Sequence, residues 1–469
     1  MTRNAALVML ACLGCGEANE PVAARASPPR VLSSPAEAVD LDADPLVVHV
    51  RLRAAPALHR IGDSEYPGFA YNGQLPGPTI RARVGDTLVV ELENALEFDT
   101  TLHWHGLSVP YAMDGVTWQT GAVKPGETFT YSFEVTAAGT FWYHPHFDSE
   151  RQVDLGLYGA LIVEAPTEPA LDDELVLIFD SWGEFRAESG SGGHGTPGTR
   201  PGALEPALGP LHTNEHTPDP GRWTVNGLVA PAFPSRSGTS LRVRLINASN
   251  DDYLDLHWSQ IRQIASDQGL LPALQTPERL LLAPGDRAEV EWLLGGDDFG
   301  IHAEPYSMHG GVALGESHEL LRVETEGSRT APPAPEWPFS GTAASSDPGS
   351  TDIVYVFTGD AGGSDWRING ERYPDVTIEE LDLGSTAVLE LRNASATEHP
   401  FHLHGHAFEV LAVGGVAPAV RMLEDTINVR IGEVVRLRLH ADNVGDWMAH
   451  CHLLSHAEGG MMTVLRVRP

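Results

Sequence analysis

The segment His450–Cys451–His452 places one thiol between two imidazoles near the end of the chain. Successive side chains of a strand point to opposite faces, so Cys451 would face one way and both histidines the other. His456 and Met461 follow, placed to return to the cysteine's side after a turn. Two imidazoles, one thiolate and a weak thioether form a blue-copper electron-transfer site. This segment supplies all of those donors except one imidazole.

Further histidines occur in pairs, in the segments HWH, YHPH and HPFHLH. The two rings of each His-x-His pair lie on one face of a strand. Together with the pair around the cysteine, these pairs offer eight neutral nitrogen donors, enough to hold three copper ions as one cluster. The pairs are His103/His105, His144/His146, His402/His404 and His450/His452. His399 then completes the blue-copper site, and Cys451 would bridge the two centres through its bonds to His450 and His452.

A repeated strand pattern predicts the architecture that must position these residues. A turn, then alternating apolar residues and a closing asparagine, occurs at 87–94, 240–247 and 386–393. Alternation with a period of two is typical of antiparallel strands with one buried face. Three copies about 150 residues apart predict three related β-sandwich domains.

Shifts in composition suggest where these domains begin and end. We expect domains at 45–166, 167–328 and 351–469, with a Pro/Ser-rich linker at 329–350. Residues 186–222 are rich in glycine and proline, which favours a long covering loop within the second domain.

The first 44 residues are expected to be an export signal and tether. Arg3 precedes an apolar run that is too short to span a membrane. Cys15 follows small residues, so cleavage before it with lipid attachment and cleavage without lipid both stay open. We therefore expect an exported protein, periplasmic or secreted. At most Cys15 and Cys451 remain after processing, which excludes a disulfide framework.

The formal net charge of −34 excludes nucleic acid as a partner, because such a surface repels phosphate. The sequence favours no particular oligomeric state.

The four histidine segments resemble, in the same order, the four copper-binding motifs of the multicopper oxidases of the bacterial, three-domain, laccase-like type. The similarity extends over nearly all of residues 45–469, including Met-Asp-Gly at 113–115 and RQVDLGLYGALIVE at 151–164. The resemblance implies an all-β chain of three cupredoxin-like Greek-key sandwiches. It also implies four copper ions: one type 1 ion in the third domain, and one type 2 and two type 3 ions between the first and third.

Transferred motif by motif, the resemblance assigns a role to each donor. His399, Cys451 and His456 would bind type 1 copper with Met461 axial, and His103 and His402 would bind type 2 copper. The type 3 pair would take His105, His144, His146, His404, His450 and His452.

The implied enzyme is a copper-dependent oxidoreductase with dioxygen as acceptor. It would oxidise phenolic, aromatic or metal-ion reductants one electron at a time at type 1 copper, passing electrons through Cys451 to the cluster that reduces dioxygen to water. Asp114 matches an acidic position that assists proton supply, so we expect it to be catalytic. Several bacterial relatives carry a glutamate directly after the second type 1 histidine; here that position is Ala457, and Glu458 is one place further.

Two alternatives stay open. One is a periplasmic cuprous oxidase that serves copper tolerance, although the methionine-rich inserts of specialised cuprous oxidases are absent from this sequence. The other is a copper-binding envelope protein without turnover, which the complete set of donors disfavours. A copper nitrite reductase is also disfavoured, because it lacks the histidines on both sides of the cysteine.

Overall fold

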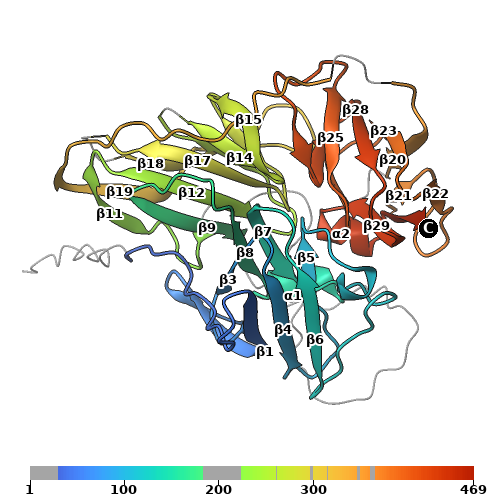
Figure 1. Cartoon of the computed structure of the whole chain (residues 1–469), viewed down its shortest axis with the longest axis horizontal. Helices are drawn as coiled ribbons and strands as arrows, with labels where there is room; N and C mark the ends of the chain where they lie inside the picture. Colours follow the sequence, from blue (N-terminus) through green and yellow to red (C-terminus); the bar gives the residue numbers. More distant parts are fainter. Residues whose placement is uncertain are drawn as a thin grey trace, which may run out of the picture.

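The computed structural model describes residues 30–182, 223–259, 261–295, 299–313, 315–345, 349–359 and 365–469. This part of the chain is built almost wholly of strands, arranged in six sheets (Figure 1). The predicted all-β class is therefore confirmed. Cys15 and the whole of the predicted 186–222 loop lie outside the described residues, as do residues 1–29 of the predicted export signal and tether.

The first two sheets pack face to face around one apolar core that includes Leu52, Leu92 and Trp104. One sheet has the order β2-β1-β4-β6, formed by β1 (Val47–Ile61), β2 (Ser64–Tyr71), β4 (Thr87–Asn94) and β6 (Thr128–Glu134). The other has the order β3-β8-β7-β5, formed by β3 (Gly77–Arg83), β5 (His103–His105), β7 (Gly139–His144) and β8 (Gly159–Glu164). A 3-10 turn, η1 (Tyr111–Met113), follows β5.

The middle pair of sheets encloses a second core. The larger sheet, β10-β9-β12-β17-β14-β15, contains β9 (Asp173–Ser181), β10 (Trp223–Val225), β12 (Ser240–Asn247), β14 (Gln263–Ser266), β15 (Gly269–Gln275) and β17 (Arg287–Leu293). The smaller sheet, β11-β19-β18-β13-β16, contains β11 (Ala232–Ser237), β13 (Leu254–His257), β16 (Leu280–Leu282), β18 (Phe299–Glu304) and β19 (His318–Ser328). Leu32, in the segment expected to be a tether, is buried in this core, so part of that segment is packed.

The C-terminal pair encloses a third core, which includes Cys451 and Met461. One sheet, β21-β20-β23-β28-β25-β26, contains β20 (Ile353–Thr358), β21 (Arg367–Ile368), β23 (Thr386–Asn393), β25 (Phe408–Val413), β26 (Leu423–Glu424) and β28 (Val434–His440). The other, β22-β30-β29-β24-β27, contains β22 (Glu379–Asp382), β24 (His399–Leu403), β27 (Thr426–Val429), β29 (Gly445–Cys451) and β30 (Met462–Arg468). The sheets thus form three sandwiches, while the domain boundaries proposed from composition stay a prediction.

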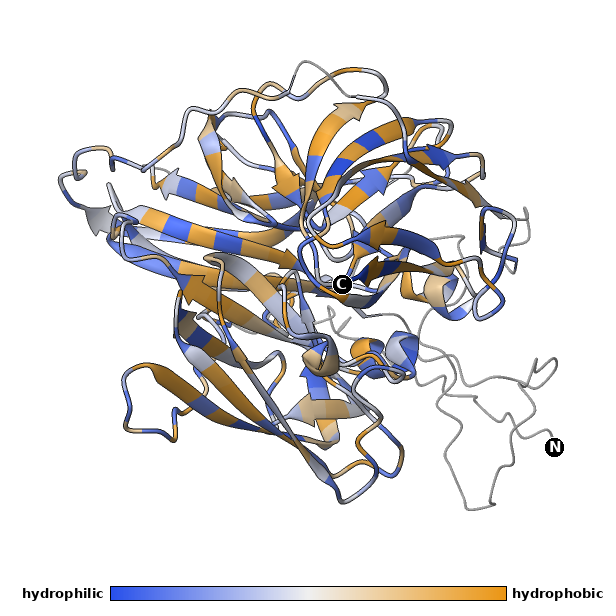
Figure 2. Cartoon of the chain, turned by 45° about the vertical axis from the view of Figure 1, so that its right-hand side comes forward, coloured by the Kyte–Doolittle hydropathy of each residue, from blue (hydrophilic) through white to orange (hydrophobic). Residues whose placement is uncertain are grey.

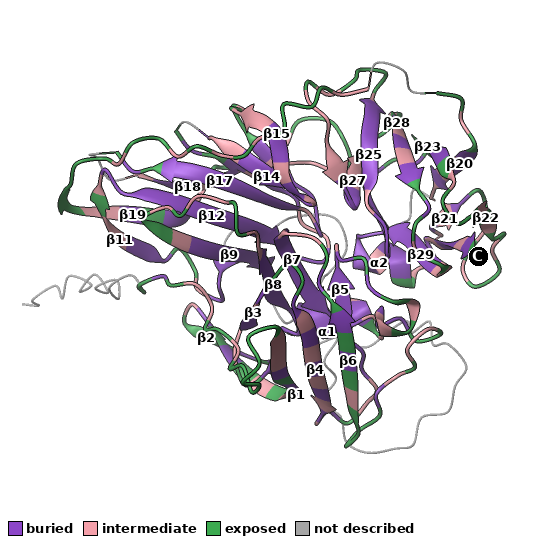
Figure 3. Cartoon of the chain, in the orientation of Figure 1, coloured by how far each residue is buried: buried purple, intermediate pink, exposed green. Residues whose placement is uncertain are grey.

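Alternating hydropathy along the strands explains this layering. Figure 2 shows apolar and polar residues alternating along many strands, as expected when one face of a sheet is buried. Strands near the junction of the sandwiches, such as β7 and β29, are buried along most of their length (Figure 3). Two short helices also meet there: α1 (Ser149–Asp154) follows β7 and contacts α2 (Leu454–Glu458), which follows β29. No helix among the described residues is long and apolar enough to cross a bilayer.

The asparagine that closes each repeated strand has a structural function. Asn94, Asn247 and Asn393 are buried, and each amide Nδ2 donates to two main-chain carbonyls at 2.7–3.0 Å. Each Oδ1 accepts the N–H of the residue two positions on. Buried main-chain groups need such partners. The asparagine therefore stabilises the bend that follows each strand, which explains why it recurs.

We predict that Asn247→Ala lowers the free energy of unfolding by about 3 kcal/mol, because buried main-chain groups lose their partners. Calorimetric unfolding should show a lower midpoint temperature. Ser249→Ala is the matched control, since it removes only one hydroxyl bonded to the Asn247 Oδ1, at 2.8 Å. Equal destabilisation by the two substitutions would contradict the role assigned to the asparagine.

Candidate metal centres

A buried group in the third sandwich brings together one sulfur and two imidazoles. Cys451 Sγ lies 3.4 Å from His399 Nδ1 and 3.6 Å from His456 Nδ1, and the two nitrogens are 3.2 Å apart. His399 begins β24, Cys451 ends β29, and His456 lies in α2. We call these three residues the thiolate site. A blue-copper centre uses donors of these types, and the three ligand atoms lie close enough to share one ion.

Met461 lies next to the thiolate site, as the sequence predicted. Its carbonyl accepts the Cys451 N–H at 3.1 Å, and its own N–H donates to the His456 carbonyl at 2.9 Å. Its side chain is fully buried in the same apolar core. The turn after α2 therefore returns Met461 to the side of Cys451.

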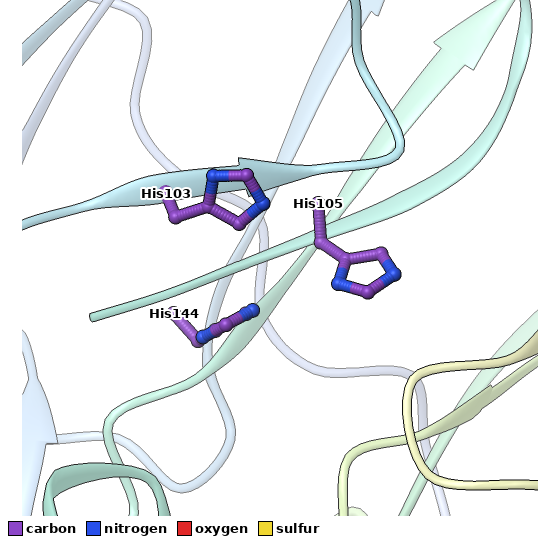
Figure 4. Close-up of side chains that lie close together, drawn as sticks. All are labelled: His103, His105 and His144. Carbon is purple, nitrogen blue, oxygen red and sulfur yellow. The ribbon is translucent and has the colours of Figure 1, made fainter. Parts of the chain in front are cut away.

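The eight paired histidines gather between the first and third sandwiches, and we call them the histidine cluster. Figure 4 shows three of them, His103 and His105 on β5 and His144 on β7. Rings from distant segments stack on one another: His103 lies 3.9 Å from His404 and His105 lies 3.8 Å from His402, between centroids. The full set is His103, His105, His144, His146, His402, His404, His450 and His452. Overlapping triplets of these rings have ligand atoms within 4.8 Å of one another.

The orientation of the rings shows that the cluster fits metal ions. Nδ1 of His103, His144, His402 and His450 donates to a main-chain carbonyl at 2.8–3.0 Å. Each ring therefore carries its proton on Nδ1 and keeps the Nε2 lone pair for a ligand. In three of the four, Nε2 is buried without a hydrogen-bond partner in the described structure. Burying a ring nitrogen without a hydrogen-bond partner is unfavourable in free energy, and a bound cation would supply the missing partner.

His105 has the opposite orientation. Its Nε2 lies 3.0 Å from the Thr426 hydroxyl and 3.1 Å from an Asp425 carboxylate oxygen, and its Nδ1 is buried without a partner among the described residues. His105 therefore presents Nδ1 to the cluster, whereas His402 and His144 present Nε2. The hydrogen-bond acceptor on the side of each ring that faces away from the cluster therefore decides which ring nitrogen carries the proton.

Burial keeps these imidazoles neutral. Loss of solvent, reinforced by neighbouring rings, lowers the pKa of His105, His144 and His404 well below the ordinary value of 6.5. The same causes lower the pKa of His450 to about 3, and burial alone lowers that of His399 to about 3. Copper binds the neutral ring, so the cluster is ready for metal at neutral pH. Burial raises the pKa of the Cys451 thiol, so its thiolate requires a bound cation.

Asp114 connects the first sandwich to the third. Its Oδ2 lies 2.8 Å from His404 Nδ1, and its Oδ1 lies 3.3 Å from His103 Nδ1. The Asp114 carbonyl accepts the proton of His103 Nδ1. The side chain is fully buried. Asp114 therefore orients two rings of the cluster, and its expected part in proton supply stays a prediction.

Asp425 is a site residue that the sequence analysis missed. Its Oδ1 lies 3.1 Å from His105 Nε2 and 3.4 Å from His402 Nδ1, and it accepts Arg287 Nη1 at 2.7 Å. Burial acts to raise the pKa of Asp425, but the Arg287 cation and hydrogen bonds from the two histidines hold it well below its usual value. Arg287 lies on β17, so the middle sandwich also supports the cluster. No local motif marks Asp425, because its partners lie elsewhere in the chain.

Glu458, one place after the expected glutamate position, joins α2 to α1. Its Oε1 accepts the Ser149 N–H at 3.0 Å and the Ser149 hydroxyl at 3.1 Å. Ala457 at the preceding position is buried. The Glu458 carboxylate, two positions after His456, is therefore bonded to the start of α1, the helix that follows His144 and His146.

Comparisons with known proteins agree with this geometry. Two profiles described as multicopper oxidase match residues 57–168 and 346–469. The multicopper oxidase MmcO of Mycobacterium tuberculosis is 30% identical over 451 residues, covering 89% of this chain and 86% of that protein. A multicopper oxidase from Campylobacter jejuni, described as a metallo-oxidase, superposes with a TM-score of 0.75 at 25% identity, covering 94% and 96% of the two chains. Another from Pseudomonas thermotolerans gives 0.73 at 28% identity, covering 90% and 99%.

We predict that Asp425→Ala weakens metal binding by the histidine cluster about 10–100-fold, because two ligand rings lose their acceptor. Copper per chain after dialysis against a competing chelator should fall, while absorption from the thiolate site persists. Asp382→Ala is the control, since that side chain is 74% exposed. Unchanged copper retention by Asp425→Ala would refute the assignment.

We also predict that the metal-free protein loses stability as the pH falls below about 6.5, the ordinary histidine pKa. Below this pH, histidines bind protons in the unfolded chain, whereas the buried rings of the folded protein stay neutral. Each such ring therefore lowers the free energy of unfolding by about 1.4 kcal/mol per pH unit. The loss should continue toward pH 3, where His399 and His450 begin to protonate in the folded state. Thermal unfolding from pH 7.5 to 4 measures the slope. A flat profile would exclude buried neutral rings.

Proposed function

We propose that this chain holds two copper centres with different functions. The chain belongs to the multicopper oxidase family. The protein is a copper-dependent oxidoreductase that uses dioxygen as electron acceptor, and the family binds four copper ions. The assignment of ligands is our proposal, and the orphaned ring nitrogens of the histidine cluster support it most directly.

In this proposal the thiolate site and Met461 bind the type 1 ion. His103 and His402 bind the type 2 ion, and each presents an Nε2 that has no hydrogen-bond partner among the described residues. The type 3 pair is bound by His105, His144, His146, His404, His450 and His452. Mutual stacking of rings from the first and third sandwiches supports a cluster shared between them.

When bound, the copper ions take single electrons from a reductant and deliver four of them to dioxygen, giving water. Cys451 links the two centres, because its side chain belongs to the thiolate site and both sequence neighbours belong to the histidine cluster. A second link is the hydrogen bond that His450 Nδ1 donates to the Cys451 carbonyl at 2.8 Å. Both links keep the centres at a fixed separation.

We propose that Asp114 serves proton supply in addition to orienting His404 and His103. It is a fully buried carboxylate in direct contact with rings of both sandwiches. Ala457 offers no carboxylate at the position that relatives use. Glu458 holds α1 against α2, and thus keeps the segments that follow the two groups of ligands together.

The proposed reductants are one-electron donors, phenolic, aromatic or metallic. Relatives include a laccase of Trametes villosa, 27% identical over 84% of each chain, and the metallo-oxidase of Campylobacter jejuni. A periplasmic cuprous oxidase remains the second candidate, favoured by similarity to a copper resistance protein A homolog of Pseudomonas syringae at 24% identity. The complete donor sets argue against a binding protein without turnover.

We also propose export through residues 1–44, with lipid on Cys15 as one of the two open outcomes.

We predict that Cys451→Ser abolishes the blue absorption of the copper-loaded protein and reduces oxidation of a phenol to the background rate. Copper bound by the histidine cluster should remain. Visible absorption, copper analysis and an oxygen electrode measure the three effects. Persistent blue colour in this variant would exclude Cys451 as the type 1 ligand.

His144→Ala is the matched counterpart. It removes a ring of the histidine cluster and leaves the thiolate site complete, so blue absorption should persist while oxygen uptake stops. Normal oxygen uptake would remove His144 from the cluster.

A further inference from the structure

Trp366 covers the face of one ring of the thiolate site. Its indole stacks on His456 with centroids 3.7 Å apart and planes at 29°, and it meets His399 edge-on at 5.5 Å. The side chain is 4% exposed and belongs to the same core as Cys451. No copper motif includes this residue.

The Gly359 main chain lies against the indole ring. Thr358 pairs with Arg367 across β20 and β21, and Gly359 and Trp366 are the next residues beyond that pair. A Cβ on Gly359 would lie 2.1 Å from the indole ring, so any larger residue would displace it. The indole therefore fills a space bounded by the Gly359 main chain and the His456 imidazole, which we call the slot.

His456 is the ring through which electrons can be received. His399 has no exposed surface, and its Nε2 donates to the Ser395 hydroxyl at 2.7 Å. His456 retains 4% exposure. His456 is therefore the less buried of these two residues, and the indole occupies a face of its ring on which a planar molecule would stack.

We propose that Trp366 determines the class of reductant, by filling the position where a planar aromatic donor would stack on His456. The protein then favours compact inorganic donors, which need no stacking contact with the ring. This inference depends on the proposed function, in which His456 is a type 1 ligand. The donor loses one electron, dioxygen finally accepts it, and the indole forms no bond and undergoes no net change.

Trp366→Ala tests this directly, because it opens a slot that matches an aromatic ring. The copper-loaded variant should oxidise 2,6-dimethoxyphenol with a kcat/KM about tenfold higher than the unsubstituted protein, from the new stacking contact. Oxidation of ferrocyanide should change by less than about twofold, since this donor gains no stacking contact. An unchanged ratio between the two donors would overturn the proposal. A parallel fall in both rates, with blue absorption intact, would also overturn it, because the indole would then conduct electrons.

Binding gives a second measurement that does not depend on turnover. Apolar cavities left by removal of a buried side chain bind aromatic molecules of matching size. Free indole should therefore bind the metal-free Trp366→Ala protein in a calorimetric titration and should not bind the unsubstituted protein. Absence of binding to the variant would show that no open slot exists.

Two further variants complete the design. If Trp366→Ala loses its blue absorption, Trp366→Phe keeps a ring in the slot and should give a smaller gain for the phenol; no gain would overturn the proposal. Trp337→Ala is the control, because this indole contacts Arg242 of the middle sandwich, and neither rate should change.

Loss of blue colour on Cys451→Ser together with an unchanged donor ratio in Trp366→Ala would refute only this inference. Persistent blue colour in Cys451→Ser would refute the proposed function itself.

Discussion

Eight imidazoles can share a dry interior only if each is uncharged and each has an acceptor for its one N–H. In this chain, carbonyls of Asp114, Pro145, Asp425 and Cys451 accept those protons for four of the rings. The remaining lone pairs converge, and their mutual burial is tolerable because a cation can satisfy them. The geometry of the cluster is thus set by the outer partners as much as by the histidines.

These outer partners make the three sandwiches interdependent. Asp114, from the first, contacts His404 of the third, and Arg287, from the second, pairs with Asp425 behind His105 and His402. Removing one partner of such a buried pair leaves an uncompensated charge, which is more damaging than losing a surface contact. The middle sandwich, which contributes no ring to either centre, therefore still supports the cluster through Arg287.

The thiolate site has a different environment. Its donors lie in an apolar core with Met461 and Trp366, whereas the histidine cluster is surrounded by carboxylates and carbonyls. Strand alternation keeps the two environments apart although Cys451 is bonded directly to His450 and His452. The end of β29 thus has one side in an apolar core beside an indole and another side lined with hydrogen-bond acceptors.

The sequence by itself determined the β class, the repeated sandwich pattern, the paired histidines that the fold brings together and the alternation around Cys451. All of these are local: a period of two or a spacing of a few residues encodes them, so they can be read without the fold. Asp425, the support from Arg287, the tautomer of His105 and the cover provided by Trp366 were decided only by the tertiary structure. Each depends on a contact between residues far apart in the chain, such as the 138 positions between Arg287 and Asp425. Such contacts arise from the packing of whole sheets, and the residues that make them carry no local pattern to mark them.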